Sequence, residues 1–364
     1  MHDPVDLAGR LVALDTRGGG ERVAADLLAD LLDDGGFAVR VTEPEPGRAN
    51  LVARRGAGPP TTLTGHLDTV PADPAGWSFD PHAGDVVDGR LRGRGSTDMK
   101  GGVAAITVAA LRSGPDAGLQ LVFTFGEETG GDGARTLTDL EPSPLLLVAE
   151  PTSNRVLHGH KGVLWLRLSA AGVSAHGSRP ELGRNALVAL ARAATRLHDH
   201  DGWPVSPTHG PATCNPGVLR SGTQPNLVPD HAELELDLRL VPGFDADAAR
   251  AVVAGLAGDT GGAGHLRTDT MIDLPAIGTD PADPRAAPAA RELGHRGGAA
   301  EFATYFTDAS VLARRLGTGG RDCAVLVCGP GDPELAHVTD ETCSAANIAA
   351  CTDALVRACA AAPG

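Results

Sequence analysis

The hydrophobic and polar positions of the first 160 residues follow two different periods. The segment Glu21–Leu32 has apolar residues at helical spacing and is followed by Gly35-Gly36, which predicts a helix that ends at the glycines. Three short apolar runs predict buried strands, and a run of small residues between the first two predicts another helix. The strands are expected at 61–64, 119–125 and 145–149, and this helix at 102–111. Such alternation indicates an α/β domain whose mostly parallel sheet is covered by helices on both faces.

From about residue 163 the pattern changes. Two segments alternate apolar and polar residues, as strands do when one face of their sheet is exposed, and two others have helical spacing. Together with two shorter strand-like runs they give the order strand-helix-strand-strand-helix-strand. In chain order these segments are 163–171, 184–197, 217–220, 232–241, 245–256 and 265–271. This order predicts a ferredoxin-like α+β domain.

The last part of the chain returns to the first pattern. Residues 308–316 and 345–361 have helical spacing, and 323–328 is an apolar run typical of a buried strand. A chain of 364 residues exceeds the size at which a single core stops growing. We therefore predict an α/β domain made of residues 1–162 and 272–364, with the domain 163–271 inserted into it.

Composition limits the partners and the location of the protein. The net charge of −15 argues against nucleic acid or an anionic membrane as the main partner. No apolar run is long enough for a membrane span, and the first residues lack the features of a signal peptide, so we expect a cytoplasmic protein. The six cysteines form no C-x-x-C pair and are expected to be reduced and buried. Of 31 basic residues only Lys100 and Lys161 are lysines.

Residues that can bind metal ions follow the carboxyl ends of the predicted strands. Ligands of open α/β sheets bind at this edge, so side chains that follow different strands meet there. Imidazoles and carboxylates suit zinc, and one carboxylate can bridge two ions. These residues are His66 and Asp68 after the first strand, Glu127 and Glu128 after the second, Glu150 after the third, His337 after 323–328, and Asp98 in a glycine-rich loop.

Each of these residues also has an ordinary structural explanation. His66 and Asp68 could be a simple hydrogen-bonded pair, and paired glutamates often lie on a solvated face or at a helix start. Asp98 could cap the helix that follows it. Their common position at one sheet edge favours a metal site over these separate explanations.

Three motifs carry a resemblance to a known family. The segments GHLDTVP (65–71), GRGSTDMKGG (93–102) and GEE (126–128) resemble the zinc aminoacylase and carboxypeptidase superfamily. Within it the chain is similar to acetylornithine deacetylase and succinyl-diaminopimelate desuccinylase over nearly its whole length. The resemblance implies a homodimeric amidohydrolase of amino-acid biosynthesis with two zinc ions per subunit, which cobalt could replace. Its substrate would be a small N-acyl amino acid.

The resemblance also implies a role for each residue of the site. Asp68 would hold the ring of His66 in one tautomer. Glu127 would be the general base that deprotonates the attacking water and returns the proton to the leaving amine. The ligands of one zinc ion would be His66, Asp98 and Glu150, and those of the other Asp98, Glu128 and His337, with Asp98 as the bridge.

For the inserted domain the resemblance implies a lid and a dimer contact. His176, in the segment 174–178, would reach the partner subunit's site and stabilise the oxyanion. Asn226 and Arg239 lie in segments that resemble those contacting the substrate carboxylate. His176 could instead be a surface histidine, and Arg239 an exposed strand residue paired with a nearby acid. The role of His158, His160 and Lys161 stays open, and we leave them outside the site.

Three alternative functions share features with this sequence. A dinucleotide-binding fingerprint would need a third glycine where Asp98 stands. A binding protein without catalysis is disfavoured because every expected ligand and Glu127 are present. A zinc dipeptidase or carboxypeptidase with the same site is the main alternative. The segment 329–341 resembles the ending of acetylornithine deacetylase, whereas 305–309 departs from both branches, so the acyl group and the amino acid, free or carrier-bound, stay open.

Overall fold

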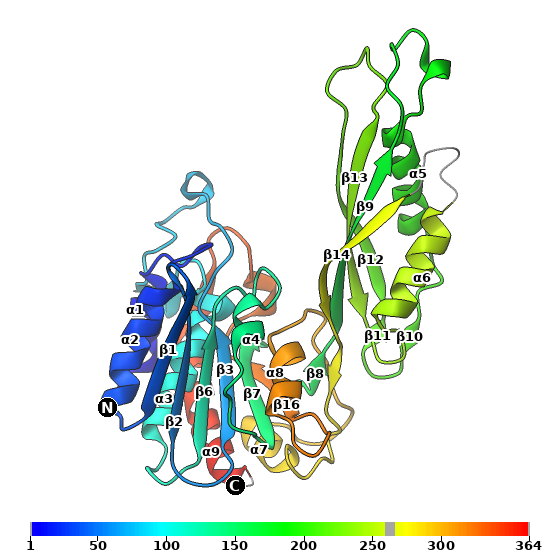
Figure 1. The fold of residues 1–364 in the computed structure, drawn as a ribbon. Coiled ribbons are helices and arrows are strands. Elements are labelled where there is room, and N and C mark those ends of the chain that lie inside the picture. Colours follow the sequence, from blue (N-terminus) through cyan, green and yellow to red (C-terminus); the bar gives the residue numbers. More distant parts are fainter. Residues whose placement is uncertain (1, 259–265, 363–364) are drawn as a thin grey trace. The chain divides into compact units, whose positions relative to one another are not determined.

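The computed structural model describes residues 2–258 and 266–362, and the chain divides into two compact units (Figure 1). The second unit reaches further at both ends than the segment 163–271 predicted from the sequence. It also includes a short return segment that no pattern indicated. The first unit comprises Met1–Gly159, Gly278–Glu301 and Thr307–Gly364, and the second His160–Ile277 and Phe302–Phe306.

A six-stranded sheet forms the centre of the first unit, in the order β1-β2-β6-β3-β7-β16. The last four strands in this order are parallel to one another, whereas β2 pairs antiparallel with both β6 and the edge strand β1. The predicted, largely parallel sheet is thereby confirmed. The strands are β1 (Ala38–Glu45), β2 (Arg48–Arg55), β3 (Thr61–His66), β6 (Leu119–Thr124), β7 (Leu145–Pro151) and β16 (Ala324–Gly329).

The four parallel strands are buried along their whole length, because helices pack against both faces of the sheet. One group of helices shares a single apolar core with the sheet. Two further helices contact strands of the sheet but do not belong to that core. The first group is α1 (Pro4–Val12), α2 (Glu21–Asp34), α3 (Gly101–Arg112), α7 (Ala287–Leu293) and α9 (Ala345–Ala361), and the other two are α4 (Asp132–Thr136) and α8 (Ala309–Leu316).

Close packing of α3 on β7 fixes the loop that precedes α3. A Cβ atom added at Gly102 would lie 2.2 Å from the carbonyl oxygen of Ala149, so a larger residue would push the helix away from the strand. Asp98 lies just before this helix, in the turn η2 (Ser96–Lys100), and the peptide bond between Asp98 and Met99 is cis. The run of small residues thus places the loop of Asp98 beside the end of β7.

The second unit is an antiparallel sheet in the order β12-β13-β9-β14 with two helices. This is the predicted ferredoxin-like arrangement. Alternate residues of β13, among them Leu234, Leu236 and Leu238, are buried in one core with both helices. His265, expected to begin the last strand, lies outside the described residues. The elements are β9 (Gly162–Ala171), α5 (Ala186–His198), β12 (Thr213–Ser221), β13 (His231–Leu240), α6 (Ala246–Ala257) and β14 (Arg267–Leu274).

Several short elements complete the described part of the chain, and the sequence pattern predicted none of them. The strands are β4 (Val86–Val87), β5 (Arg90–Arg92), β8 (Gly159–His160), β10 (Val205–Ser206), β11 (Gly210–Pro211), β15 (Ile277–Gly278) and β17 (Thr342–Ser344). The remaining helical turns are η1 (Pro74–Gly76), η3 (Pro180–Leu182) and η4 (Pro333–Leu335).

All six cysteines are free thiols, and all except the partly exposed Cys214 are buried. Across residues 2–258 and 266–362, no helix combines the length and the apolar character needed to cross a membrane.

Candidate metal centre

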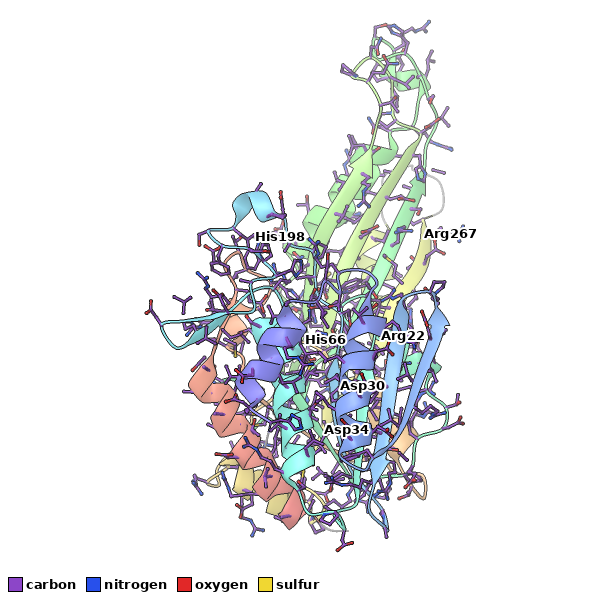
Figure 2. All side chains as sticks on the ribbon, turned by 90° about the vertical axis from the view of Figure 1, so that its left-hand side faces the viewer. Arg22, Asp30, Asp34, His66, His198 and Arg267 are labelled. Atoms are coloured by element: carbon purple, nitrogen blue, oxygen red, sulfur yellow. The ribbon has the colours of Figure 1, made fainter. Side chains whose placement is uncertain are left out.

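Parallel strands bring the candidate ligands to one edge of the sheet in the first unit. His66 is the last residue of β3, and Glu150 lies next to the end of β7. Glu127 and Glu128 follow β6, and His337 follows β16 after the turn η4. Because all four strands run in the same direction, their carboxyl ends lie side by side. The side chain of His66 lies in the interior of this unit, where only 2% of the residue is exposed (Figure 2).

Asp98 lies between the two histidines. Its Oδ1 is 3.1 Å from Nε2 of His66, and its Oδ2 is 3.3 Å from Nε2 of His337. His66 Nε2 is also 3.9 Å from Oε1 of Glu150, and His337 Nε2 is 3.1 Å from Oε1 of Glu128. One carboxylate therefore presents a separate oxygen to each imidazole.

Two overlapping groups of donor atoms are compact enough to hold a metal ion. One consists of His66, Asp98 and Glu128, and the other of His66, Glu127 and Glu150. Within each group the donor atoms lie within 4.8 Å of one another. Glu127, which the resemblance assigns as a base, thus also lies within the reach of a metal ion at this site.

Asp68 holds the loop that carries the two glutamates. Its Oδ1 accepts a hydrogen bond from the backbone N–H of Glu127 and its Oδ2 from that of Glu128, each at 3.2 Å. Gly126, with φ of +66°, supplies the left-handed turn before this pair. The ring Nδ1 of His66 lies 3.0 Å from the backbone oxygen of Asp68 and 3.6 Å from its carboxylate, so the carbonyl is the ring's partner here.

The buried carboxylates of the site would be stabilised by a bound cation. Burial and the charge of Glu150 raise the pKa of Glu127 well above its ordinary value, and burial and the charge of Asp98 do the same for Glu150. Hydrogen bonds to Asp98 and Glu128 raise the pKa of His337 to about 10. Crowded, buried carboxylates are costly unless a positive charge compensates them. The mixed nitrogen and oxygen donors suit a divalent metal ion such as zinc.

The sequence did not single out Glu341, which is fully buried beside this site. Its Oε1 accepts hydrogen bonds from the backbone N–H groups of Thr97 and Asp98, and its Oε2 pairs with Arg94. The available sequence signal was weak, namely an acidic residue shortly after His337 in an otherwise loop-like segment.

The inserted unit contains the other residues assigned from the sequence. His176 Nδ1 lies 2.8 Å from Oγ of Ser178, and the N–H of Gly177 donates to the backbone oxygen of Asn226 at 2.7 Å. His176 and Asn226 are therefore neighbours within this unit. Both are exposed.

Arg239 lies away from that pair, near the last residue of β13. Its Nη2 donates to Oδ2 of Asp237 at 2.8 Å, and its guanidinium lies 5.8 Å from the ring centre of Phe306. The buried Nη1 of Arg239 has no hydrogen-bond partner among the described residues. The carboxylate of Asp237 thus neutralises one end of the guanidinium, and Nη1 at the other end is left for a further hydrogen bond.

A largely parallel α/β sheet with clustered carboxylates and imidazoles at its carboxyl edge is the arrangement of a metal-dependent hydrolase. Residues 62–361 match peptidase family M20/M25/M40, and the chain belongs to that family. The resemblance drawn from the three motifs is thereby confirmed. The protein is a metal-dependent hydrolase that acts on amides.

Relatives of different specificity are similar to the chain. An acetylornithine deacetylase from Vibrio campbellii is 33% identical over 359 residues, which cover 93% of this chain and 91% of the relative. A probable succinyl-diaminopimelate desuccinylase from Staphylococcus epidermidis is 30% identical over 385 residues, covering 93% and 92%. A probable carboxypeptidase from Aspergillus clavatus is 36% identical over 294 residues, covering 72% of this chain and only 63% of the relative.

Solved structures share the fold. An M20 family metallo-carboxypeptidase from Sulfolobus solfataricus superimposes with a TM-score of 0.77 at 16% identity, covering 99% of both chains. A tripeptidase from Staphylococcus aureus gives a TM-score of 0.73 at 22% identity, covering 98% of this chain and 96% of the other. At these identities the likeness concerns the fold alone.

Proposed function

We propose that the protein is a dinuclear zinc amidohydrolase that removes the acyl group from a small N-acyl amino acid. The observation that carries this proposal is the position of Asp98, with one carboxylate oxygen facing His66 and the other facing His337. A carboxylate between two such donors is suited to bridging two metal ions. The near full-length similarity to a deacetylase and a probable desuccinylase supports the N-acyl amino acid as the substrate class.

We propose two ligand sets that share Asp98 as the bridge. Mixed imidazole and carboxylate ligands favour zinc, and Co²⁺ has similar ligand preferences. When bound, zinc supplies a Lewis acid for the scissile carbonyl and lowers the pKa of water. We assign His66, Asp98 and Glu150 to one ion, and Asp98, Glu128 and His337 to the other.

Glu127 is proposed as the general base. Its backbone N–H donates to Asp68, and its carboxylate belongs to the same compact group of donor atoms as His66 and Glu150, which supports a role in proton transfer at this site. It would take a proton from the attacking water and give it to the nitrogen of the leaving amino acid. The adjacent Glu128 would stay a ligand.

The second unit would act as a lid and as the dimer contact. We propose that Arg239 binds the substrate carboxylate through its unused Nη1 and that Asn226, which lies beside His176 and away from Arg239, contributes a further hydrogen bond to the substrate of the partner subunit. His176, exposed on the loop beside Asn226, would stabilise the oxyanion in the partner subunit of a homodimer. The free thiols fit a reducing compartment, which supports the cytoplasm as the location.

A zinc dipeptidase or carboxypeptidase is the second candidate, because the probable carboxypeptidase shares 36% identity with the chain. A panel of N-acetyl amino acids, N-succinyl amino acids and dipeptides, assayed with zinc-loaded protein, separates the two. Faster turnover of N-acyl amino acids supports the deacylase, and a clear preference for dipeptides supports the second candidate. Failure to hydrolyse any member of the panel would overturn both.

A further inference from the structure

The carboxylate of Glu341 lies against the backbone of the loop that carries Asp98. Glu341 is 0% exposed, and its Oε1 is 2.8 Å from the backbone nitrogen of Thr97 and 3.1 Å from that of Asp98. A single oxygen therefore accepts two successive N–H groups. This contact fixes the peptide from which the side chain of Asp98 projects.

The rest of Glu341 is attached to the same loop. Its Oε2 is 2.5 Å from Nη1 of Arg94, which is 5% exposed, and its backbone oxygen accepts from the N–H of Gly93 at 3.0 Å. Both the charge and the backbone of Glu341 thus contact the segment 93–98. Because the ion pair is buried, either partner alone would leave a costly unpaired charge.

Glu341 also belongs to the short segment that carries His337. Both His337 and Asp340 have left-handed backbone conformations, with φ of 62° and 58°, which residues other than glycine adopt infrequently. Oδ1 of Asp340 accepts from the N–H of Ser78 at 2.8 Å. The segment 337–341 is therefore held by two contacts, that of Asp340 with the N–H of Ser78 and that of Glu341 with the Asp98 loop.

We infer that Glu341 is a positioning residue, which couples the Asp98 loop to the His337 segment and thereby sets the metal affinity of both positions of the proposed centre. This inference rests on the proposed function. Asp98 faces both histidines, so a shift of its backbone disturbs both ligand sets at once. Loss of an outer partner of this kind costs about 10–100-fold in metal affinity.

The variant E341Q tests the inference, because the amide keeps the shape but turns a donor towards either Arg94 or the loop N–H groups. Metal-free protein is titrated with Zn²⁺ in competition with a chromophoric chelator. We expect both binding steps to weaken, by about tenfold or more. The variant H337A, which removes one terminal ligand, should weaken one step far more than the other.

A matched control is D283N. Asp283 pairs with Arg285, which also donates to the backbone oxygen of Asp322, just before β16 begins and thus at the opposite end of the sheet. This variant also changes an arginine-paired carboxylate to an amide, yet it should bind Zn²⁺ like the parent protein.

If E341Q does not fold, E341D is titrated with Zn²⁺ in its place. This variant keeps the charge but shortens the side chain by one methylene group. Folding is checked by circular dichroism and a cooperative thermal transition. A folded variant that binds Zn²⁺ at both steps as tightly as the parent would overturn the inference alone. A parent protein that binds no Zn²⁺ would overturn the proposed metal centre, and the inference with it.

Discussion

The Nε2 atom of His337 lies 3.1 Å from Oε1 of Glu128, although 209 positions separate the two residues in the chain. The contact forms because β6 and β16 belong to one sheet and end at the same edge. The last part of the chain therefore completes a site that the first part begins. The inserted unit interrupts the sequence of this site without interrupting its sheet.

Removal of metal should abolish activity. The proposed ligands are deprotonated carboxylates and neutral imidazoles, so a chelator should strip the site, and added Zn²⁺ or Co²⁺ should restore turnover. Metal that binds only the folded protein should also raise its melting temperature. Full activity after exhaustive dialysis against a chelator, with no metal detected by elemental analysis, would contradict the proposal.

Glu127 and Glu128 should respond differently to the same substitution. E127Q keeps the shape of the side chain but removes the base, so kcat should fall by about 100-fold or more while metal content is unchanged. E128Q should lower metal occupancy instead. Metal content and kcat are measured on the same preparations. Near-normal turnover of E127Q would mean that another group is the base.

D68N should impair the site although Asp68 is not assigned as a ligand. Its two oxygens accept the N–H groups of Glu127 and Glu128, and the amide would oppose one of these donors with another donor. We expect a loss of about 10–100-fold in metal affinity or kcat/KM. D132N, at an exposed carboxylate close to the same loop, is the control and should behave like the parent. Equal behaviour of the two variants would exclude this role.

R239M should raise KM for substrates with a free carboxylate. A hydrogen bond to a charged group contributes about 1.5–3 kcal/mol, which corresponds to a KM increase of roughly tenfold or more. The same substrate with its carboxylate converted to an amide serves as control, because the parent and the variant should hydrolyse it equally. If KM rises equally for both substrates, Arg239 supports the fold of the second unit and does not bind the substrate carboxylate.

Mixed dimers should show whether His176 acts across subunits. H176A and E127Q chains are each expected to be nearly inactive. In a mixed dimer one site combines the intact Glu127 of one chain with the intact His176 of the other, so activity should reappear after subunit exchange. If exchange is demonstrated but activity does not return, the histidine acts within its own chain or has no catalytic role.

The residues at the strand ends could be predicted because their position follows from the sheet alone. Apolar runs such as 119–125 mark buried parallel strands, and whatever follows them reaches the same edge. The hairpin β1–β2 gave no such signal. Strand β1 is mostly exposed or half-buried and contains Pro44 among charged residues, so its sequence resembles that of a loop.

The supporting contacts could not be predicted, because they depend on tertiary packing. An acidic residue in a loop, such as Glu341, has the same local sequence whether it is solvated or fully buried. Asp68 was expected to hold the ring of His66, and the sequence does not indicate that its backbone oxygen lies closer to Nδ1 than its carboxylate does. The carboxylate and the backbone oxygen of one aspartate can exchange such a contact without any change in sequence.

The two lysines of the chain are both buried, Lys100 with 2% and Lys161 with 5% of its surface exposed. Amine-reactive reagents need an accessible amine, so they should leave both side chains unmodified while the protein is folded. The surface positive charge of the described chain comes from arginine, which these reagents do not attack. A lysine introduced at an exposed position such as Val205, which is 71% exposed, would therefore be a unique side-chain attachment point for a dye or a solid support.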